Sequence, residues 1–223
     1  MIKFKGWMLS WVLRLQRMTW RVHIEGRENL DRLYADEKRF LLCFWHGKYV
    51  PIFPLLEGCK ACVVSSRSVR GSVIAEIGRN FGYQSTQMPD RPSRDSLRLM
   101  REVLSEARAW GIAVDGPLGP RGRVKSGVIR MASALEFDLL PVSLDSRRKM
   151  VFNRRWDRME IPLPFTTVCL VFGEPIKVPP ELRFGQVKNL ADKLAEAISQ
   201  LDAKTENMVR ENLPQKECLK DFH

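Results

Sequence analysis

The feature that most constrains the fold is an alternation of short apolar segments with longer segments of helical periodicity, beginning near residue 40. The apolar segments carry no charged residues, which is typical of strands buried on both faces. The predicted strands are 40–45, 61–65, 83–88, 112–114 and 139–144. The predicted helices are 72–81, 93–110 and 128–137. Because such alternation builds parallel sheets covered by helices on both faces, we predict an α/β fold with a mostly parallel central sheet.

The alternation of strands and helices stops in the C-terminal third of the chain. Between residues 161 and 172 one strand follows another, and apolar residues at 187, 190, 194, 198 and 201 predict a closing amphipathic helix. A chain of 223 residues suffices for one domain with a full core. We expect an N-terminal amphipathic helix over 1–22, an α/β domain over 23–204, and a loosely ordered tail over 205–223.

The N-terminal segment has an unusually broad apolar side. Wound as a helix, it places Lys3, Ser10, Arg14, Arg17 and Arg21 in one narrow stripe. The neighbouring arc contains Phe4, Trp7, Met8, Trp11, Val12, Leu15 and Met18. Its charges leave no apolar run near the roughly 20 residues that span a bilayer, and tryptophan among basic residues is typical of a helix on an anionic phospholipid membrane surface. The alternative is a helix packed on the protein's own core with its basic stripe in water.

The net charge limits the classes of binding partner, and the cysteine content indicates the redox environment. Thirty-seven Lys and Arg against 26 Asp and Glu give a net charge of +11, which favours nucleic acid, an anionic membrane or a phosphorylated substrate. Nucleic acid is not expected, because the aromatic residues are not interleaved with Arg on a polar face. Five cysteines without a signal peptide indicate a reduced, cytosolic chain. Cys59 and Cys62 match C-x-x-C but run into an apolar strand, and no second pair completes a metal site.

Three unusual sequences follow predicted strands: His46-Gly47, the Ser-rich loop 65–71, and the Gly-rich loop 115–123. Ligands of open α/β sheets bind beyond the C-terminal ends of the strands, so we expect these loops to line one cleft. Histidine is the side chain whose unperturbed pKa, about 6.5, best suits it to accept a proton at neutral pH, so His46 is a candidate general base. Gly47 permits close approach of another group. The alternative for His46 is an ordinary polar residue at a strand end.

These segments together resemble the lysophospholipid-acyltransferase-like superfamily, in a bacterial branch long catalogued only as a domain of unknown function. The resemblance runs in register from about Arg21 to Pro180. Its motifs are Phe44-Trp45-His46-Gly47, Ser65 with Arg70-Gly71, Val114-Asp115-Gly116-Pro117-Leu118-Gly119-Pro120-Arg121, Lys125-Ser126-Gly127-Val128, Leu140-Pro141-Val142-Ser143, Trp156-Asp157-Arg158 and Ile161-Pro162-Leu163-Pro164-Phe165.

The resemblance implies a glycerol-3-phosphate acyltransferase-like fold and a peripheral enzyme on the cytoplasmic face of the bacterial inner membrane. Such an enzyme moves a fatty acyl group from acyl-CoA or acyl carrier protein to a hydroxyl of a lysophospholipid or related lipid acceptor, without a bound cofactor or metal. His46 matches the family's general base, and Asp115 is expected to act with it. The expected substrate-binding residues are Trp45, Gly47, Arg67, Arg70, Gly116, Pro117, Arg121 and Arg123, with Arg121 on a lipid phosphate. The alternative for these arginines is a solvated loop charge.

One departure from the family pattern concerns the acid that orients the histidine. The best-known members have H-x-x-x-x-D, and here the acidic position is Pro51. We expect Asp115 to orient His46, with Glu57 a second candidate; otherwise the histidine acts without support, or the protein binds lipid without catalysis. Trp156 and Asp157 are predicted to be a core tryptophan beside an acid in a turn.

Overall fold

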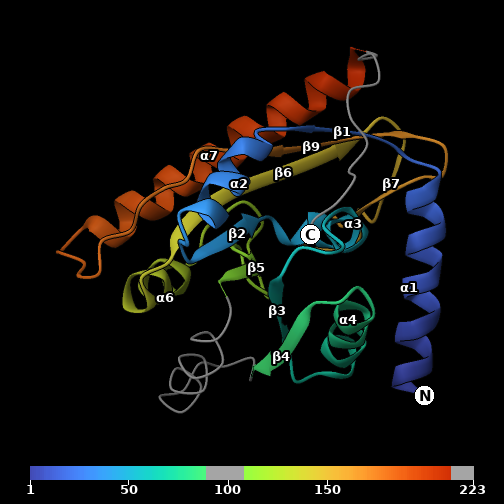
Figure 1. Ribbon diagram of the computed structural model, residues 1–223, viewed down its shortest axis with the longest axis horizontal. Coiled ribbons are helices and arrows are strands. Elements are labelled where there is room, and N and C mark those ends of the chain that lie inside the picture. Colours follow the sequence, from blue (N-terminus) through green and yellow to red (C-terminus); the bar gives the residue numbers. More distant parts are fainter. Residues whose placement is uncertain (89–107, 212–223) are drawn as a thin grey trace.

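The centre of the molecule, a computed structural model that describes residues 1–88 and 108–211, is a seven-stranded sheet (Figure 1). The strand order is β1-β9-β6-β2-β5-β3-β4. The strands are β1 (Arg21–Glu25), β2 (Phe40–Phe44), β3 (Ala61–Ser66), β4 (Gln84–Met88), β5 (Ala109–Ala113), β6 (Asp138–Ser146) and β9 (Thr167–Phe172). All neighbouring pairs are parallel except β6 with β9, so the predicted mostly parallel α/β sheet is confirmed. A separate antiparallel hairpin joins β7 (Lys149–Val151) to β8 (Glu160–Pro162).

Helices cover both faces of the sheet. They are α1 (Ile2–Met18), α2 (Arg27–Ala35), α3 (Tyr49–Leu55), α4 (Val69–Asn80), α6 (Ser126–Leu135) and α7 (Gln186–Arg210), with a 3-10 turn η1 (His46–Lys48). Strand β2 is buried along its whole length, and its alternate side chains enter different cores. Phe40, Leu42 and Phe44 join the core of α1 to α4, whereas Leu41 and Cys43 pack with α6 and α7. Two helical layers therefore explain why β2 carries no charge.

Several predicted boundaries differ from the structure. Helix α1 ends at Met18, and the unpredicted strand β1 begins at Arg21, within the segment 1–22 expected to be helical. Most of the helix predicted at 93–110 lies outside the described residues, but its last two residues, Ala109 and Trp110, belong to β5 and pair with β2 and β3. Helix α7 continues to Arg210, so residues 205–210 are helical rather than part of a loose tail. Thr205 is fully buried, and its hydroxyl donates to the carbonyl of Asp202 at 3.0 Å.

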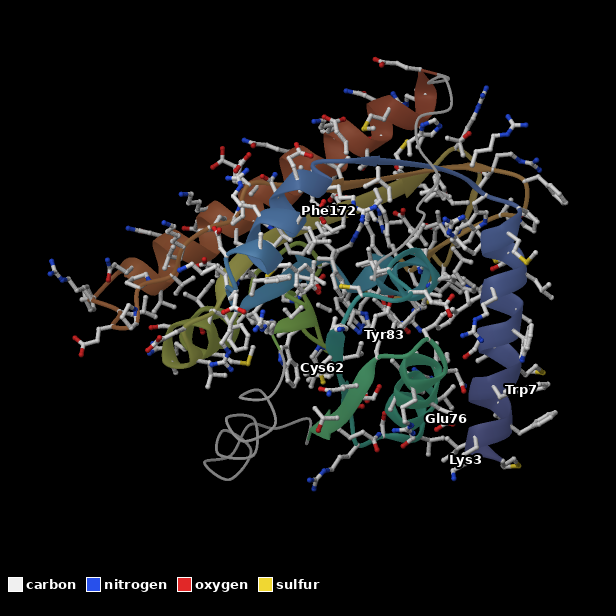
Figure 2. All side chains as sticks on the ribbon, in the orientation of Figure 1. Lys3, Trp7, Cys62, Glu76, Tyr83 and Phe172 are labelled. Carbon is white, nitrogen blue, oxygen red and sulfur yellow. The ribbon has the colours of Figure 1, made fainter. Side chains whose placement is uncertain are left out.

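Helix α1 turns part of its polar stripe toward the protein, where it packs on α4 (Figure 2). Ser10 is buried, and Gly6 lies so close to α4 that an added Cβ would be 2.6 Å from the Glu76 side chain. The guanidinium of Arg14 pairs with Glu57 at 2.6 Å and lies 4.8 Å from the centre of the Phe81 ring.

The apolar arc of α1 is left exposed. Its large side chains are 38% to 81% exposed: Ile2, Phe4, Trp7, Met8, Leu9, Trp11, Val12, Leu15 and Met18. The helix is therefore amphipathic as predicted, but the alternative in which the arc packs on the core with the basic stripe in water is wrong. No helix among residues 1–88 and 108–211 is long and apolar enough to cross a bilayer.

Candidate active site

His46 lies directly beyond the C-terminal end of β2, in the turn η1. Its Nδ1 is 2.7 Å from Oδ2 of Asp157, which comes from the loop between β7 and β8. Asp157 is fully buried, whereas the side chain of His46 is 23% exposed. The arrangement places a partly exposed imidazole beyond the C-terminal end of a central strand, in contact with a buried carboxylate.

Asp157 is held in its ionised form by its neighbours. Burial alone would raise the pKa of this carboxyl, but hydrogen bonds from Arg155 and His46 outweigh it and lower the pKa to about 2. Arg155 donates to both carboxylate oxygens, at 2.9 and 2.7 Å. Because an ionised carboxylate only accepts hydrogen bonds, Nδ1 of His46 carries a proton, and in the neutral imidazole Nε2 therefore presents a lone pair. Among the described residues, Nε2 has no hydrogen-bond partner.

The prediction that Asp115 orients the imidazole is wrong. Asp115 is fully buried beyond β5, and its Oδ1 accepts the backbone N–H of His46 at 2.8 Å rather than a ring nitrogen. Burial raises the pKa of Asp115, and hydrogen bonds from the backbone N–H groups of His46 and Gly122 offset this only in part. Asp115 therefore fixes the backbone from which the histidine projects. Glu57, the second candidate, pairs with Arg14 of α1 instead.

The prediction of a core tryptophan at position 156 is also wrong. Trp156 is 38% exposed, and its ring centre lies 5.1 Å from that of His46. The ring of Tyr49 lies at the same distance from the imidazole. The Trp156 ring contacts Gly119 so closely that a Cβ there would be 2.5 Å from it. Both aromatic rings contact His46 and restrict its orientation.

Gly47 is required by the same geometry. An added Cβ would lie 2.3 Å from the backbone oxygen of Asp157, closer than any non-bonded contact allows. Any larger residue at position 47 therefore pushes the loop that carries Asp157 away from His46. The expectation that Gly47 permits close approach holds, but the approaching group is the protein's own backbone.

The other predicted site residues lie in different surroundings. Trp45 is only 4% exposed and packs in the core with α6 and α7. Pro117 and Arg67 are exposed, Gly116 has a φ of +71°, and Arg70 is close enough to Tyr49 to influence the pKa of its hydroxyl. Arg121 lies 3.8 Å from Glu160, and Arg123 lines a groove between α6 and α7. The structure thus brings Asp115 next to His46 and Arg70 near Tyr49, whose ring contacts His46. Arg121 and Arg123 have other neighbours, Glu160 and the groove.

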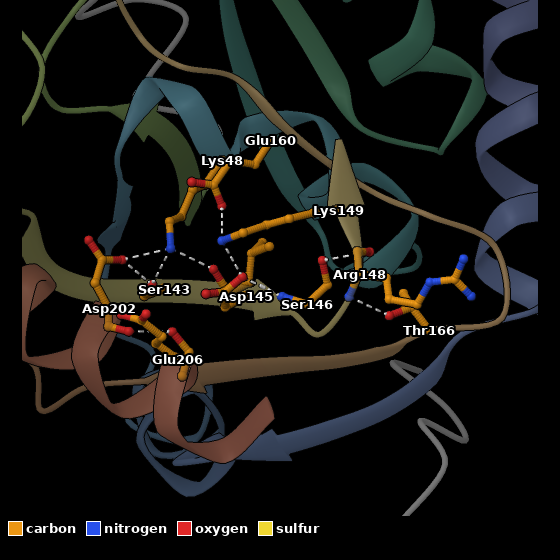
Figure 3. Close-up of polar contacts among 12 residues, drawn as sticks. Lys48, Ser143, Asp145, Ser146, Arg148, Lys149, Glu160, Thr166, Asp202 and Glu206 are labelled. Atoms are coloured by element: carbon orange, nitrogen blue, oxygen red, sulfur yellow. Dashed lines mark hydrogen bonds and ion pairs between the residues drawn. The ribbon is translucent and has the colours of Figure 1, made fainter. Parts of the chain in front are cut away.

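A network of polar contacts supports the two elements that carry His46 and Asp157, the turn η1 and the β7–β8 hairpin; Figure 3 shows its contacts around Lys48 and Lys149. Lys48, two residues after His46, is 6% exposed and donates to the carbonyl of Leu144 at 2.7 Å and to Asp202 of α7 at 3.0 Å. These bonds tie η1 to β6 and α7.

The second half of the network holds the hairpin that carries Asp157. Lys149 of β7 bridges Asp145 of β6, at 2.6 Å, and Glu160 of β8, at 2.8 Å. Burial would lower the pKa of Lys149, but the hydrogen bonds to these two carboxylates raise it, so the bridge stays charged. The hairpin is therefore bound to the same strand, β6, as the turn that carries His46.

Comparison with known proteins shows which known fold the chain resembles. No protein-family model matches the chain. The chain is 25% identical over 174 residues to "Uncharacterized protein RP090" of Rickettsia prowazekii (strain Madrid E), covering 76% of this chain and 78% of that protein. Among solved structures it is similar to PlsC, the 1-acyl-sn-glycerophosphate (LPA) acyltransferase of Thermotoga maritima, with a TM-score of 0.55 and 21% identity, over 91% of this chain and 78% of that one. The chain has an acyltransferase-like fold.

Proposed function

We propose that the protein is a membrane-associated O-acyltransferase that moves a fatty acyl group from a thioester to a hydroxyl of a lysophospholipid or related lipid. The observation that carries the proposal is the 2.7 Å contact between Nδ1 of His46 and Asp157 on an acyltransferase-like fold. In this proposal Asp157 acts as the orienting acid, which the family pattern has at the position that is Pro51 here. The contact is formed by a residue 111 positions away in the sequence rather than five.

In the proposed reaction, Nε2 of His46 takes the proton of the acceptor hydroxyl as its oxygen attacks the thioester carbonyl. The carbon–sulfur bond then breaks, and the departing thiolate takes that proton from the imidazolium, which restores the starting state. Asp157 stabilises the transient imidazolium and keeps the ring proton on Nδ1. General-base catalysis of this kind contributes about 10² to 10⁴-fold in rate.

The membrane part of the proposal rests on α1. A helix that turns Ser10 and Arg14 inward and leaves Trp7, Trp11 and Leu15 about half exposed needs another apolar surface for its outer face. The interface of an anionic bilayer satisfies both this face and the net charge of +11.

Liposome sedimentation tests the membrane part. Two half-buried tryptophans contribute about 2 kcal/mol to interface binding, so Trp7→Ala with Trp11→Ala should bind anionic vesicles about thirtyfold more weakly. Phe184→Ala is the control, because it removes a fully exposed ring from the loop before α7, at the opposite end of the molecule from α1 (Figure 1). Equal binding by all three proteins would contradict docking through α1.

The catalytic part is tested by transfer of radiolabelled acyl groups from acyl-CoA and from acyl carrier protein to a panel of lysolipids. His46→Ala should lose the activity of the wild type while keeping its circular dichroism spectrum. A wild type that is silent with every donor and acceptor, but binds vesicles, would instead favour a lipid-binding protein without catalysis. A fully active His46→Ala would exclude His46 as the base.

A further inference from the structure

A groove of about 990 Å³ lies apart from His46, between the N-terminal parts of α6 and α7. It is bordered by loop 122–125, by the first turns of α6, and by the segment 182–195. Its size matches that of sites for cofactor-sized molecules rather than a shallow contact for a folded partner.

The groove is strongly positive. Five cations line it against one carboxylate, Asp192; the cations are Arg123, Lys125, Arg130, Arg183 and Lys188. Four of these cations form no ion pair within residues 1–88 and 108–211, whereas Arg14 and Arg155 each bind a carboxylate; the four are Arg123, Arg130, Arg183 and Lys188. The Lys125 ammonium donates to the carbonyl of Gly119. Four uncompensated charges facing one concavity favour a ligand with several negative charges.

The backbone adds to this charge. Helix α6 begins after Lys125 and α7 after Gly185, and neither helix has a side-chain cap or an acidic residue in its first turn. Ser126 and Val187, in those first turns, both line the groove. Two sets of free N–H groups and two positive helix ends therefore lie at the same site, which is the arrangement that binds phosphate.

One side of the groove is apolar. Leu182, Val187 and Ala191 line it, and Phe184 stands fully exposed at its edge. Exposure of an aromatic ring to water costs free energy that stacking on a planar ligand recovers. The groove thus combines phosphate-binding groups with a free ring, which suits a phosphorylated nucleotide better than the acidic helix of a carrier protein.

The groove is joined to the candidate active site by one loop. The backbone N–H of Lys125 donates to the carbonyl of Val114 at 2.8 Å, and the next residue, Asp115, accepts the backbone N–H of His46. The first residue of loop 115–125 therefore contacts His46, and the last residues of the loop line the groove. A ligand with its phosphates in the groove can extend a flexible arm along this loop.

We propose that the groove between α6 and α7 binds the phosphorylated nucleotide of a coenzyme A thioester, and that coenzyme A rather than carrier protein is the acyl donor. The inference rests on the proposed acyl transfer. Arg123, Arg183, Lys188 and the two helix N-termini bind the phosphates, and Phe184 stacks on the base.

Calorimetric titration of the full chain with free coenzyme A tests the site without any turnover. Arg183→Ala with Lys188→Ala should weaken binding at least tenfold, because two charge-assisted contacts are lost. The matched control is Lys177→Ala with Lys193→Ala, which removes the same charge from exposed positions outside the groove and should change the affinity less than twofold. Phe184→Ala should weaken binding of coenzyme A but leave that of inorganic pyrophosphate unchanged.

Three results would overturn the proposal: no binding of coenzyme A by the wild type, equal losses in the two double variants, or acyl transfer from acyl carrier protein alone. The third leaves the acyltransferase function standing. His46→Ala should bind coenzyme A like the wild type, because His46 lies outside the groove. A wild type that binds coenzyme A through the groove but transfers no acyl group would refute the proposed acyltransferase function and leave the binding site standing.

Discussion

Replacing Asp157 by Asn should reduce acyl transfer by about 10³ to 10⁴-fold, because it reverses the tautomer of His46. Oδ1 of Asp157 accepts from Arg155 at 2.9 Å and from the backbone N–H of Met159 at 3.3 Å, so the amide oxygen of an asparagine keeps both bonds when it takes that position. The second bond from Arg155, at 2.7 Å to Oδ2, is then lost. The NH₂ group of the asparagine faces Nδ1 of His46, which must accept. The ring proton moves to Nε2, where it blocks the lone pair that removes the hydroxyl proton.

The same substitution has a calculable cost in stability. The pKa of Asp157 is lowered from 3.8 to about 2, which corresponds to about 2 kcal/mol of folding free energy at neutral pH. For a chain of this length, that loss lowers the melting temperature by about 4 to 8 °C. The variant should therefore remain folded at 25 °C, where its activity is measured as kcat/KM alongside its circular dichroism spectrum.

Asp115→Asn is the matched control for this experiment. Its amide oxygen can still accept the backbone N–H of His46, so the loss should stay near tenfold. If Asp157→Asn remains within tenfold of the wild type, or if Asp115→Asn shows the larger loss, the tautomer argument is refuted.

Further substitutions test the supports of the site. Gly47→Ala should reduce kcat/KM at least a hundredfold, because its Cβ would displace the loop of Asp157; an unchanged rate would contradict the close approach. Gly127→Ala meets no atom within 4 Å and should raise the unfolding free energy by about 0.5 kcal/mol in urea titrations. Lys48→Met removes the side-chain donor of the Leu144 carbonyl and the ion pair with Asp202, which keeps the Ser143 hydroxyl, and should cost about 2 kcal/mol in the same assay. Because the folded pKa of Asp157 lies below the unfolded one, its stabilisation is complete above about pH 4 and is lost as the pH falls toward 2, so acid titrations should show a shallower loss in Asp157→Asn.

Most central strands were predictable from the sequence because burial on two faces leaves few charged residues in a strand. The edge strand β1 was not predicted, and β6 extends to Asp138 and to Asp145, which pairs with Lys149. The segments around Leu41, Cys62 and Leu140 contain no residue that water must solvate, and each is a strand within one or two residues of its predicted bounds. The start of β5 was not predictable. Trp110 continues the helical periodicity of the preceding segment, and only its pairing with β2 and β3 places it in the sheet.

The partner of His46 could not be predicted from spacing. Asp157 lies 111 residues further along, on a hairpin whose position depends on Lys149 and its two carboxylates. The sequence contained a signal in Arg155-Trp156-Asp157-Arg158, a charged run around one tryptophan, but a turn explains such a run equally well. In the same way, periodicity predicted that α1 is amphipathic, but the side that faces the protein is set by distant partners of Arg14.

The place of β1 in the sheet has a consequence for how the chain folds during synthesis. β1 pairs only with β9 in the described sheet, from Arg21 with Thr167 to Glu25 with Val171, so the ribosome adds roughly 145 residues between the two partners. At 5 to 20 residues per second, β1 waits about 7 to 30 s for its neighbour. Helix α1 packs on α3 and α4, which are made much earlier. The apolar side of α1 is therefore presented while the edge of the sheet is still unformed. On the proposed membrane docking, the order of synthesis favours attachment before the domain closes.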